Sequence, residues 1–381
     1  MIRECENVPL CEVMLDLVRA AVIVDYYPEI FTQRIDWNIL MDYSSEQGLL
    51  AWVWDGICKL GMQDHLSRQQ RINWGLSAQE IWNRYDKQKK VLVNLISECQ
   101  INNMRLLLLK GIGLSTLYPN PKSRPCGDID IFLFDDYEKG NELFAKGEGY
   151  IGLKDLGFYY DGVYIENHHT LIYTDTKKRV KANNYIKKCL PECSLNADGY
   201  YELPSIANVV YLLLHTLSHM DSEYVVSLRS VFDFGMLIKR QRSQLSKDNC
   251  CIEVMRELGL QKAFCLLINL SEYYLKVQFP EFKSISISKK DVLRAKSLVE
   301  NKESKPHSED TDSLLTHWKE TVLRHFQIRW MYKYIPRSMG EHIIFTFRRE
   351  ASLIVRKILS IPRQISIWEF LKVAFYKKYD K

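Results

Sequence analysis

One stretch of the sequence decides the fold: Cys126-Gly-Asp-Ile-Asp-Ile-Phe-Leu-Phe134 begins with acids and then runs apolar. In a β-strand, side chains two residues apart lie on the same face, so Asp128 and Asp130 point the same way and the isoleucines point into the core. An edge strand would go on alternating with polar residues, whereas residues 131–134 are all apolar. The pattern therefore predicts two carboxylates side by side at the start of a buried strand.

Two neighbouring carboxylates on a strand need a positive partner, because like charges repel and Asp is depleted in strands. Mg²⁺ takes oxygen ligands, typically one or two carboxylates plus substrate phosphates, and Mn²⁺ suits the same ligands. The structural alternative is a pair of ordinary surface acids, and a bare Asp-x-Asp favours it because short motifs recur by chance. The apolar run after Asp130 shifts the balance towards a metal site at Asp128 and Asp130.

A candidate phosphate-binding turn precedes these acids. Residues 106–109 form a continuous apolar run that predicts a buried strand, and it leads into Lys110-Gly-Ile-Gly-Leu-Ser115, where the chain turns at glycine into a helix. Backbone N–H groups at such a helix start bind phosphate oxygens, and a glycine lets them approach closely. Gly113 is interpreted as a tight turn. The candidate phosphate contacts are a lysine, a glycine, a hydroxyl and a bidentate guanidinium: Lys110, Gly111, Ser115 and Arg124.

A third carboxylate, Glu166, lies on a later strand. Residues 158–160 and 163–173 predict two strands joined by the hairpin signal Asp161-Gly162. If the second of these strands pairs beside residues 128–134, Glu166 completes an acidic cluster. His168 shares the face of Glu166, and His169 points the other way. A lone strand histidine is more often a structural hydrogen-bond partner, and a direct catalytic role for His168 is the alternative.

Helices are predicted on both sides of this α/β unit. Apolar residues recur at three and four positions over residues 8–20, 37–60 and 76–100, with a capping-box start at Ser77 and Glu80. The same spacing predicts helices over residues 208–218, 224–239 and 251–275, while residues 301–313 have the polar composition of a linker.

The predicted fold class is α+β, a small mixed β-sheet core flanked by N-terminal and C-terminal helical regions. The predicted domains are an N-terminal helical region (1–100), the α/β core (101–200), a helical domain forming the other wall of a cleft (201–300), and a basic, aromatic-rich helical region (314–381).

Composition excludes several classes of protein. The net charge of +5 is too small to argue for nucleic acid, which is not expected as a partner. Ten cysteines without a Cys-x-x-Cys pair indicate reduced thiols rather than zinc or a disulfide framework, and the acidic start of the chain does not fit a secretory signal. No apolar run is long enough to span a membrane. We therefore expect a cytoplasmic protein, or one peripheral to the inner face of the membrane.

These motifs together resemble the uncharacterised bacterial nucleotidyltransferase family of the polymerase β superfamily. In that family a lysine–glycine step precedes a helix, an arginine and a glycine lead into Asp-x-Asp, and a Glu-x-His follows on a later strand. The matching stretches here are residues 110–115, the Tyr118-Pro119 turn, residues 124–131 and residues 165–168. One departure is that no serine directly follows the glycine of the Lys110-Gly111 step.

The resemblance implies a nucleotidyltransferase core and a reaction assisted by two metal ions, Mg²⁺ or Mn²⁺. A nucleoside monophosphate would pass from a nucleoside triphosphate to a hydroxyl of a small molecule, sugar or protein, with release of pyrophosphate. The implied metal ligands are Asp128, Asp130 and Glu166, and the implied catalytic residues are these three and His168. The implied nucleotide-binding residues are Lys110, Gly111, Ser115, Arg124 and Gly127.

The resemblance extends to a His … His … Leu-Arg … Asp pattern at His215, His219, Arg229 and Asp233. Two interpretations have equal weight. One is an Arg229–Asp233 salt bridge along a helix beside a packed histidine pair, and the other is that Arg229 or Asp233 faces the acceptor from the second wall of the cleft. Zinc at the two histidines is less favoured, because no third ligand is evident.

The alternatives to an enzyme are a catalytically inactive nucleotide-binding or scaffold protein, and a peripheral membrane or nucleic-acid binder that acts through the C-terminal region. Basic and aromatic residues are interleaved from residue 321 onward, which suits a membrane surface. The same mixture suits an ordinary helix packed on a neighbour, and this second interpretation is favoured.

Overall fold

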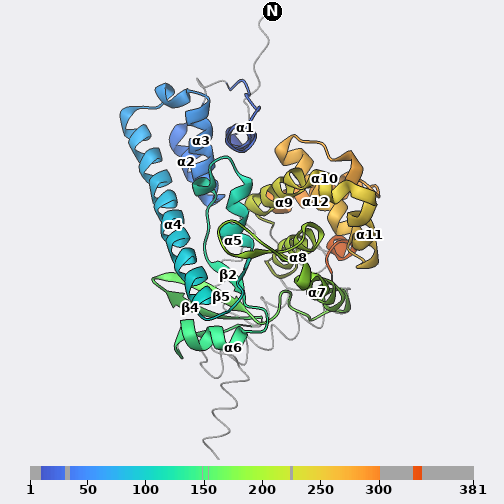
Figure 1. Cartoon of the computed structure of the whole chain (residues 1–381). Helices are drawn as coiled ribbons and strands as arrows, with labels where there is room; N and C mark the ends of the chain where they lie inside the picture. The colour runs from blue at the N-terminus through green and yellow to red at the C-terminus, as the bar shows by residue number, and fades with distance from the viewer. Residues whose placement is uncertain are drawn as a thin grey trace, which may run out of the picture.

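A computed structural model of the chain describes residues 10–30, 35–147, 149–152, 154–223, 226–300 and 329–336. It confirms the predicted α+β class, with one mixed sheet and helices on both sides of it (Figure 1). The predicted linker at 301–313 and most of the predicted basic region at 314–381 lie outside the described residues. None of the helices in the described ranges is long and apolar enough to cross a membrane.

The sheet has seven strands in the order β3-β4-β5-β2-β1-β7-β6. β2 pairs parallel with β5 and antiparallel with β1, and β4 and β5 form the predicted hairpin around Asp161-Gly162, both with positive φ. The strand bounds are β1 Leu107–Leu109, β2 Ile129–Phe132, β3 Tyr150–Ile151, β4 Asp155–Tyr160, β5 Val163–His168, β6 Ser194–Leu195 and β7 Tyr201–Glu202. The central pairing of β2 with β5 is the one that the acidic cluster requires.

The two faces of the sheet belong to two different cores. Ile129 and Ile131 of β2 pack with Leu92 and Leu95 of the long helix α4. On the other face, Phe132 joins a larger core built from the N-terminal helices and the helices after residue 205. Because Asp130 alternates with the two isoleucines, its carboxylate lies on the face that meets the second set of helices.

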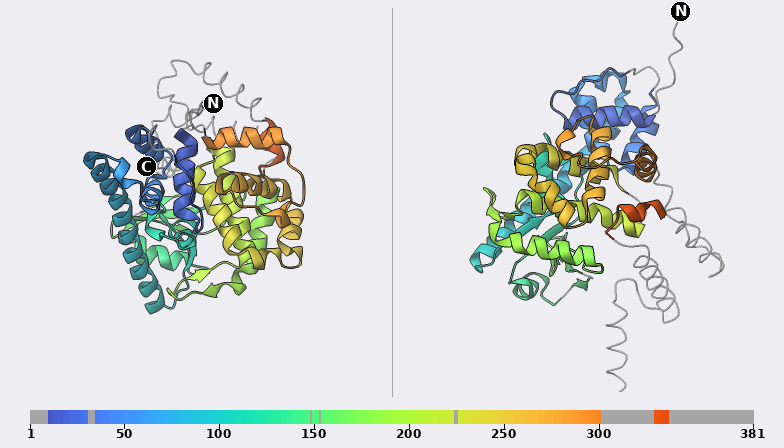
Figure 2. Two further views of the ribbon diagram at one scale, coloured as in Figure 1. Left: turned by 90° about the horizontal axis from the view of Figure 1, so that it is seen from above. Right: turned by 90° about the vertical axis from the view of Figure 1, so that its right-hand side faces the viewer.

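Different sets of helices lie on different sides of the sheet. Figure 1 shows α4 running from the N-terminal helices down to the sheet, and Figure 2 shows the later helices grouped beside the sheet unit. The helices are α1 Leu10–Val22, α2 Trp37–Glu46, α3 Leu50–Lys59, α4 Arg68–Ile101, α5 Lys110–Gly113, α6 Tyr137–Gly140, α7 Lys177–Cys189, α8 Ser205–Glu223, α9 Leu228–Arg240, α10 Arg242–Ser246, α11 Cys250–Glu257, α12 Gln261–Leu275 and α13 Lys289–Glu300. Among the short turns, η3 Leu114–Leu117 continues α5.

Several predicted helix boundaries are wrong for local reasons. The capping box lies at Ser67 and Gln70, ten residues before the predicted Ser77, so Ser77 is inside α4. The segment 37–60 is two helices separated at Gly48, and the segment 251–275 is two helices separated at Gly259, both glycines with positive φ. Residues 137–145 form α6 followed by a single π-helical turn, and β5 ends at His168 rather than at residue 173.

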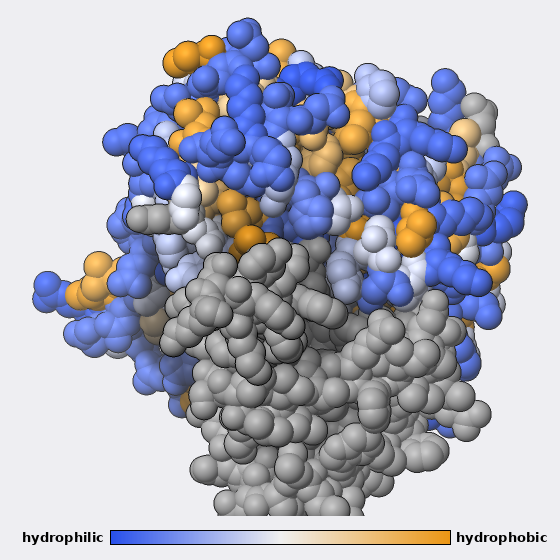
Figure 3. Space-filling view, turned by 90° about the horizontal axis from the view of Figure 1, so that it is seen from below, coloured by the Kyte–Doolittle hydropathy of each residue, from blue (hydrophilic) through white to orange (hydrophobic). Residues whose placement is uncertain are grey.

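The surface seen from below mixes hydrophilic residues with scattered hydrophobic ones over the part that the structure describes (Figure 3). Several of the large apolar side chains that are exposed in this fold occur singly, for example Ile39, Leu76 and Leu195, whereas Tyr150 and Tyr159 lie on the neighbouring strands β3 and β4. Isolated exposed apolar residues are normal for a folded protein and do not by themselves indicate a membrane-binding face.

The contact of α1 with α3 depends on Gly56. A Cβ at this position would lie 2.1 Å from the backbone oxygen of Leu17, so alanine forces the helices apart. We expect Gly56→Ala to lower the free energy of unfolding by about 1–3 kcal/mol, measured by urea denaturation.

Gly75→Ala is the matched control for this variant. Gly75 lies inside α4, and the nearest atom to its Cβ would be Cζ2 of Trp54 at 3.8 Å, an ordinary contact. Alanine there should raise stability by about 0.5–1 kcal/mol, because glycine is a poor helix former. A change of the same sign in both variants would contradict the close helix packing.

Candidate active site

Two carboxylates meet on neighbouring strands at the centre of the sheet. Asp130 of β2 is directly in register with Glu166 of β5, and His168 lies two residues further along the same face of β5. One side-chain ligand atom from each of these three residues lies within 4.8 Å of the other two. Asp130 and His168 are fully buried, while Glu166 keeps 22% of its side-chain surface exposed. The conditional strand pairing that the sequence suggested is therefore present.

Asp128 is not one of the three residues in this cluster. It precedes the first residue of β2 and is half-buried. Its charge nevertheless acts on the site, since it contributes to raising the pKa of the neighbouring Lys110 ammonium. Asp128 therefore lies at the margin of the cluster rather than inside it.

The buried Asp130 carboxylate is neutralised from two sides. Nζ of Lys110 and Nε2 of His168 both lie 2.9 Å from its Oδ1. Burial alone would raise the pKa of Asp130, yet Lys110 and His168 hold that pKa well below its usual range. Burial would likewise lower the pKa of His168, but its hydrogen bonds to Asp130 and Glu166 outweigh burial and raise it.

The other oxygen of Asp130, Oδ2, is buried and has no hydrogen-bond partner among the described residues. It faces the backbone of Gly111, where a Cβ would lie 3.7 Å from Oδ2 and 3.3 Å from the backbone oxygen of Asp128. Gly111 has φ 48° and ψ −124°, a conformation that favours glycine. The glycine therefore lets the start of α5 pass close to the carboxylates.

The charges of the site fit a divalent cation. Four carboxylates lie near one another here: Asp128, Asp130, Asp155 and Glu166. Asp155 joins the group because it is paired in register with His168. Two lysines, Lys110 and Lys154, oppose these negative charges. Lys154 lies 3.8 Å from Asp155 and 4.0 Å from Glu166. Burial and then the charge of Glu166 raise the pKa of Asp155, as an excess of negative charge requires. An unpartnered buried carboxylate oxygen beside a partly exposed Glu166 is the donor set that a magnesium or manganese ion prefers.

Polar groups of three predicted nucleotide contacts are engaged by other parts of the protein. Ser115 is buried, and its hydroxyl donates to the backbone oxygen of Ile112 at 2.6 Å. The guanidinium of Arg124 is buried and bound to protein groups on all three nitrogens. Gly127 is exposed, and its carbonyl accepts a hydrogen bond from Gln88. Lys110 and Gly111 are the two that lie beside the carboxylates.

Arg124 has a structural partner that lies far away in the sequence. Its Nε and one terminal nitrogen donate to Asp233 of α9 at 2.8 and 2.7 Å, and the hydroxyl of Tyr118 donates to the same carboxylate at 2.7 Å. Arg229, one turn earlier, donates to the backbone oxygen of Pro125 at 3.2 Å. The considered Arg229–Asp233 salt bridge is therefore wrong, because both residues bind the loop that leads to Asp128 instead.

Helix α8 brings Tyr211 and His215 within electrostatic range of the carboxylates and Lys110. Burial, and then the charges of Asp130 and Glu166, raise the pKa of Tyr211 well above its ordinary value. Burial, and then the charge of Lys110, lower the pKa of His215 well below its ordinary value. Tyr211, His215 and His219 recur every four residues, and the two histidine rings are in edge contact at 4.9 Å. The sequence pointed to the histidines and missed Tyr211, although the same spacing includes it.

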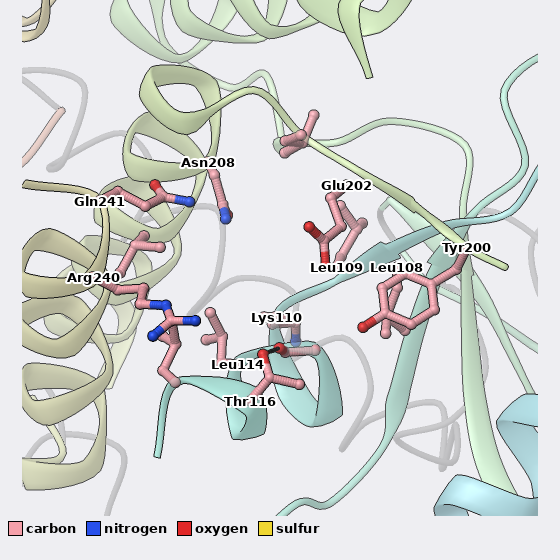
Figure 4. Close-up of a pocket in the computed structure, with 14 residues that line it drawn as sticks. Leu108, Leu109, Lys110, Leu114, Thr116, Tyr200, Glu202, Asn208, Arg240 and Gln241 are labelled. Carbon is pink, nitrogen blue, oxygen red and sulfur yellow. Dashed lines mark hydrogen bonds between the residues drawn. The ribbon is translucent and has the colours of Figure 1, made fainter. Parts of the chain in front are cut away.

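A separate pocket of about 260 Å³ lies between α5–η3 and the ends of α8 and α9 (Figure 4). Its polar lining residues include Lys110, Thr116, Asn208, Arg240 and Gln241. The three residues of the carboxylate–histidine cluster do not line it. The pocket is therefore next to the carboxylate–histidine cluster through Lys110 but is not lined by Asp130 or Glu166.

The Arg124–Asp233 ion pair should contribute strongly to stability. Both side chains are about 5% exposed, and Asp233→Asn leaves the Arg124 guanidinium buried without a counter-charge. We expect a loss of about 3–5 kcal/mol in the free energy of unfolding, measured by urea denaturation.

The control for this variant is Lys122→Ala, which breaks the nearby pair with Asp86. Both partners of that pair are about half exposed, so the loss should be about 1 kcal/mol or less. Equal losses in the two variants would show that the Arg124–Asp233 pair does not brace α9 against the loop.

Comparison with known proteins adds one finding. A family model described as "Uncharacterised nucleotidyltransferase" matches residues 33–276, which include the sheet, the carboxylate cluster and helices α2 to α12. Comparisons with curated proteins and with solved structures find no match. Since the family model covers well over half of the sequence, the chain belongs to the uncharacterised nucleotidyltransferase family.

Proposed function

We propose that the protein is a metal-dependent nucleotidyltransferase of the polymerase β type. It would transfer a nucleoside monophosphate from a nucleoside triphosphate to a hydroxyl acceptor and release pyrophosphate. The observation that carries the proposal is the in-register pair of Asp130 and Glu166, with Lys110 and Gly111 beside it. Membership of the family supports nucleotidyl transfer as the class of reaction.

Asp130 and Glu166 would hold Mg²⁺ or Mn²⁺, with Asp128 at the margin as a further ligand. When bound, the metal neutralises the phosphates and makes the acceptor hydroxyl more acidic. The fit rests on the unpartnered Oδ2 of Asp130 and on the excess of carboxylates over lysines around it.

The triphosphate would bind at the start of α5. The ammonium of Lys110 and Nε2 of His168 both bind Oδ1 of Asp130. The ammonium is therefore held beside the carboxylates, where it would contact a phosphate oxygen. Gly111 lets the backbone of α5 approach within contact distance of the same place. Ser115 and Arg124 have no part in this proposal, because their polar atoms are bound elsewhere.

Glu166 would accept the proton of the acceptor hydroxyl. It is the partly exposed member of the cluster, whereas His168 is buried and its Nε2 is already engaged by Asp130. His168 therefore orients Asp130 and steadies Glu166, whose Oε2 lies 3.6 Å from Nε2. In the reaction the acceptor oxygen bonds to the α-phosphorus, the bond to the bridging oxygen breaks, and pyrophosphate leaves with the electron pair.

A catalytically inactive nucleotide-binding protein is the second candidate. One observation favours it: Lys110 and His168 already neutralise Asp130 without a metal ion. This candidate predicts binding of a nucleoside triphosphate without turnover. The third interpretation, binding of a membrane or nucleic acid through the basic region, falls on residues that lie almost wholly outside the described ranges.

Removal of either central carboxylate tests the proposed reaction. Asp130→Asn and Glu166→Gln should each reduce magnesium-dependent release of pyrophosphate by about 100-fold or more, because each removes a charge that holds the metal. The assay uses a nucleoside triphosphate and the wild-type protein as reference. Far-UV circular dichroism checks that each variant folds.

Asp161→Asn is the matched control, since Asp161 is an exposed acid in the turn that ends the same hairpin. It should keep wild-type turnover. Magnesium-dependent binding without any turnover in the wild type would support the inactive candidate. Wild-type turnover in Asp130→Asn would contradict the assignment of Asp130 as a metal ligand.

Gly111→Ala tests the proposed approach of α5 to the phosphates. Alanine at φ 48° strains the backbone and places a methyl group against the oxygen of Asp128, so turnover should fall by about tenfold or more. The measurement is the KM for the nucleoside triphosphate together with kcat.

Gly61→Ala separates backbone strain from the site. Gly61 also has positive φ, but its Cβ would meet no atom within 4 Å. It should lower stability by about 1–2 kcal/mol without changing turnover. Equal effects of the two substitutions on turnover would show that Gly111 acts only through folding.

A further inference from the structure

The carboxylate pair belongs to a longer row of residues that crosses the sheet. From β1 to β3, the residues in direct register are Leu109, Asp130, Glu166, Gly157 and Tyr150. Residues directly opposite each other on paired strands share a face. The site face therefore continues beyond Glu166, over β4 and β3, on the side away from Lys110.

Three tyrosines occupy this outer part of the face. Tyr159 and Tyr164 are a direct cross-strand pair, with ring centroids 5.2 Å apart and an angle of 62° between the rings. Tyr159 is 70% exposed and Tyr150 is 53% exposed. Because Tyr159 lies two residues from Gly157, it is on the same face as the row. Two of the three rings are thus open to solvent.

Gly157 makes room for the third ring. A Cβ at this position would lie 1.9 Å from the hydroxyl oxygen of Tyr164, so the phenol of Tyr164 lies over the glycine that faces Glu166. Burial, and then the charge of Glu166, raise the pKa of the Tyr164 phenol, which agrees with this proximity. A glycine inside a strand weakens the strand and often marks a place where a group approaches closely. Here the missing side chain leaves room for the Tyr164 ring beside Glu166.

A purely structural role accounts for only part of this arrangement. A cross-strand tyrosine pair contributes only modestly to the stability of a hairpin. It does not explain why the exposed aromatic rings gather on the face that carries Glu166. Exposed aromatic rings beside reactive groups are typical of a surface on which a ring stacks.

The position of the rings indicates which substrate they meet. Under the proposed function the triphosphate binds at Lys110 and Gly111, beyond Asp130 at the β1 end of the row. The rings lie beyond Glu166 at the opposite end. The molecule that stacks there is therefore the acceptor, whose hydroxyl must reach Glu166.

The chemical groups around the three tyrosines indicate the class of acceptor. The acceptor must carry a hydroxyl and present a flat apolar face to the rings, and a sugar ring does both with its hydroxyl and C–H groups. Asp155 and Glu166 accept hydrogen bonds from such hydroxyls and repel phosphates, which disfavours a nucleic-acid strand. A bare nucleobase has no hydroxyl to react.

We propose that Tyr150, Tyr159 and Tyr164 form the acceptor subsite for a neutral sugar ring, with one hydroxyl turned towards Glu166. This assignment rests on the proposed function. The sugar oxygen would bond to the α-phosphorus as its proton passes to Glu166, and pyrophosphate would leave with the electrons of the broken bridging bond.

The experiment measures sugar binding and donor binding separately in one preparation of the full chain. Saturation-transfer difference NMR uses the methyl glycosides of glucose, galactose, mannose and N-acetylglucosamine as probes. Calorimetry measures the affinity for magnesium ATP. The variants are wild type, Tyr159→Ala with Tyr164→Ala, Tyr164→Phe, and the remote control Tyr27→Ala, at a tyrosine that is 68% exposed.

We expect at least one methyl glycoside to bind the wild type through its ring C–H protons. The double variant should bind this glycoside at least about tenfold more weakly. Tyr164→Phe, which keeps the ring, and Tyr27→Ala should bind it as tightly as the wild type. The affinity for magnesium ATP should be the same in all variants. The assignment is overturned if no glycoside binds, if binding persists in the double variant, or if a short oligonucleotide binds the tyrosines instead. If the wild type does not bind magnesium ATP but still binds a glycoside through the tyrosines, only the proposed function is contradicted.

Discussion

Asp130 is a carboxylate with no exposed surface, and the rest of the site is arranged around its charge. A buried unpaired ion costs several kcal/mol, so Asp130 is stable there only because Lys110 and His168 lie against one of its oxygens. This requirement fixes the start of α5, which carries Lys110, and the end of β5, which carries His168. It also leaves the second oxygen of Asp130 facing Gly111 without a partner, where a metal ion would complete its coordination.

A second buried charge pair holds the helices in place over the sheet. Arg124 and Asp233 join the loop before β2 to α9, and Arg229 adds a hydrogen bond to the same loop. These bonds tie the loop that leads to Asp128 directly to α9. Tyr211 of α8 is buried within electrostatic range of the carboxylates, since the charges of Asp130 and Glu166 contribute, after burial, to its raised pKa.

The sequence was sufficient where a local pattern carries the information. The acid–apolar alternation around Asp130 predicted a buried strand, and the Asp161-Gly162 turn predicted the hairpin that brings Glu166 beside it. It was insufficient where a partner is distant: Asp233 lies more than a hundred residues from Arg124, so the ion pair that removes Arg124 from phosphate binding has no local signal. One helix start was also misplaced, because a Ser-x-x-Gln pattern at Ser67 competes with the Ser-x-x-Glu pattern at Ser77.

The central claim is that Asp130 and Glu166 bind a divalent cation together with a nucleoside triphosphate. The most direct measurement is anomalous X-ray diffraction from crystals soaked with Mn²⁺ and a non-hydrolysable nucleoside triphosphate. The account predicts a manganese peak in contact with both carboxylates and with a phosphate oxygen, and a Lys110 ammonium that has moved towards the triphosphate. A well-ordered triphosphate with no manganese at these carboxylates, and with Lys110 still bound to Asp130, would contradict it.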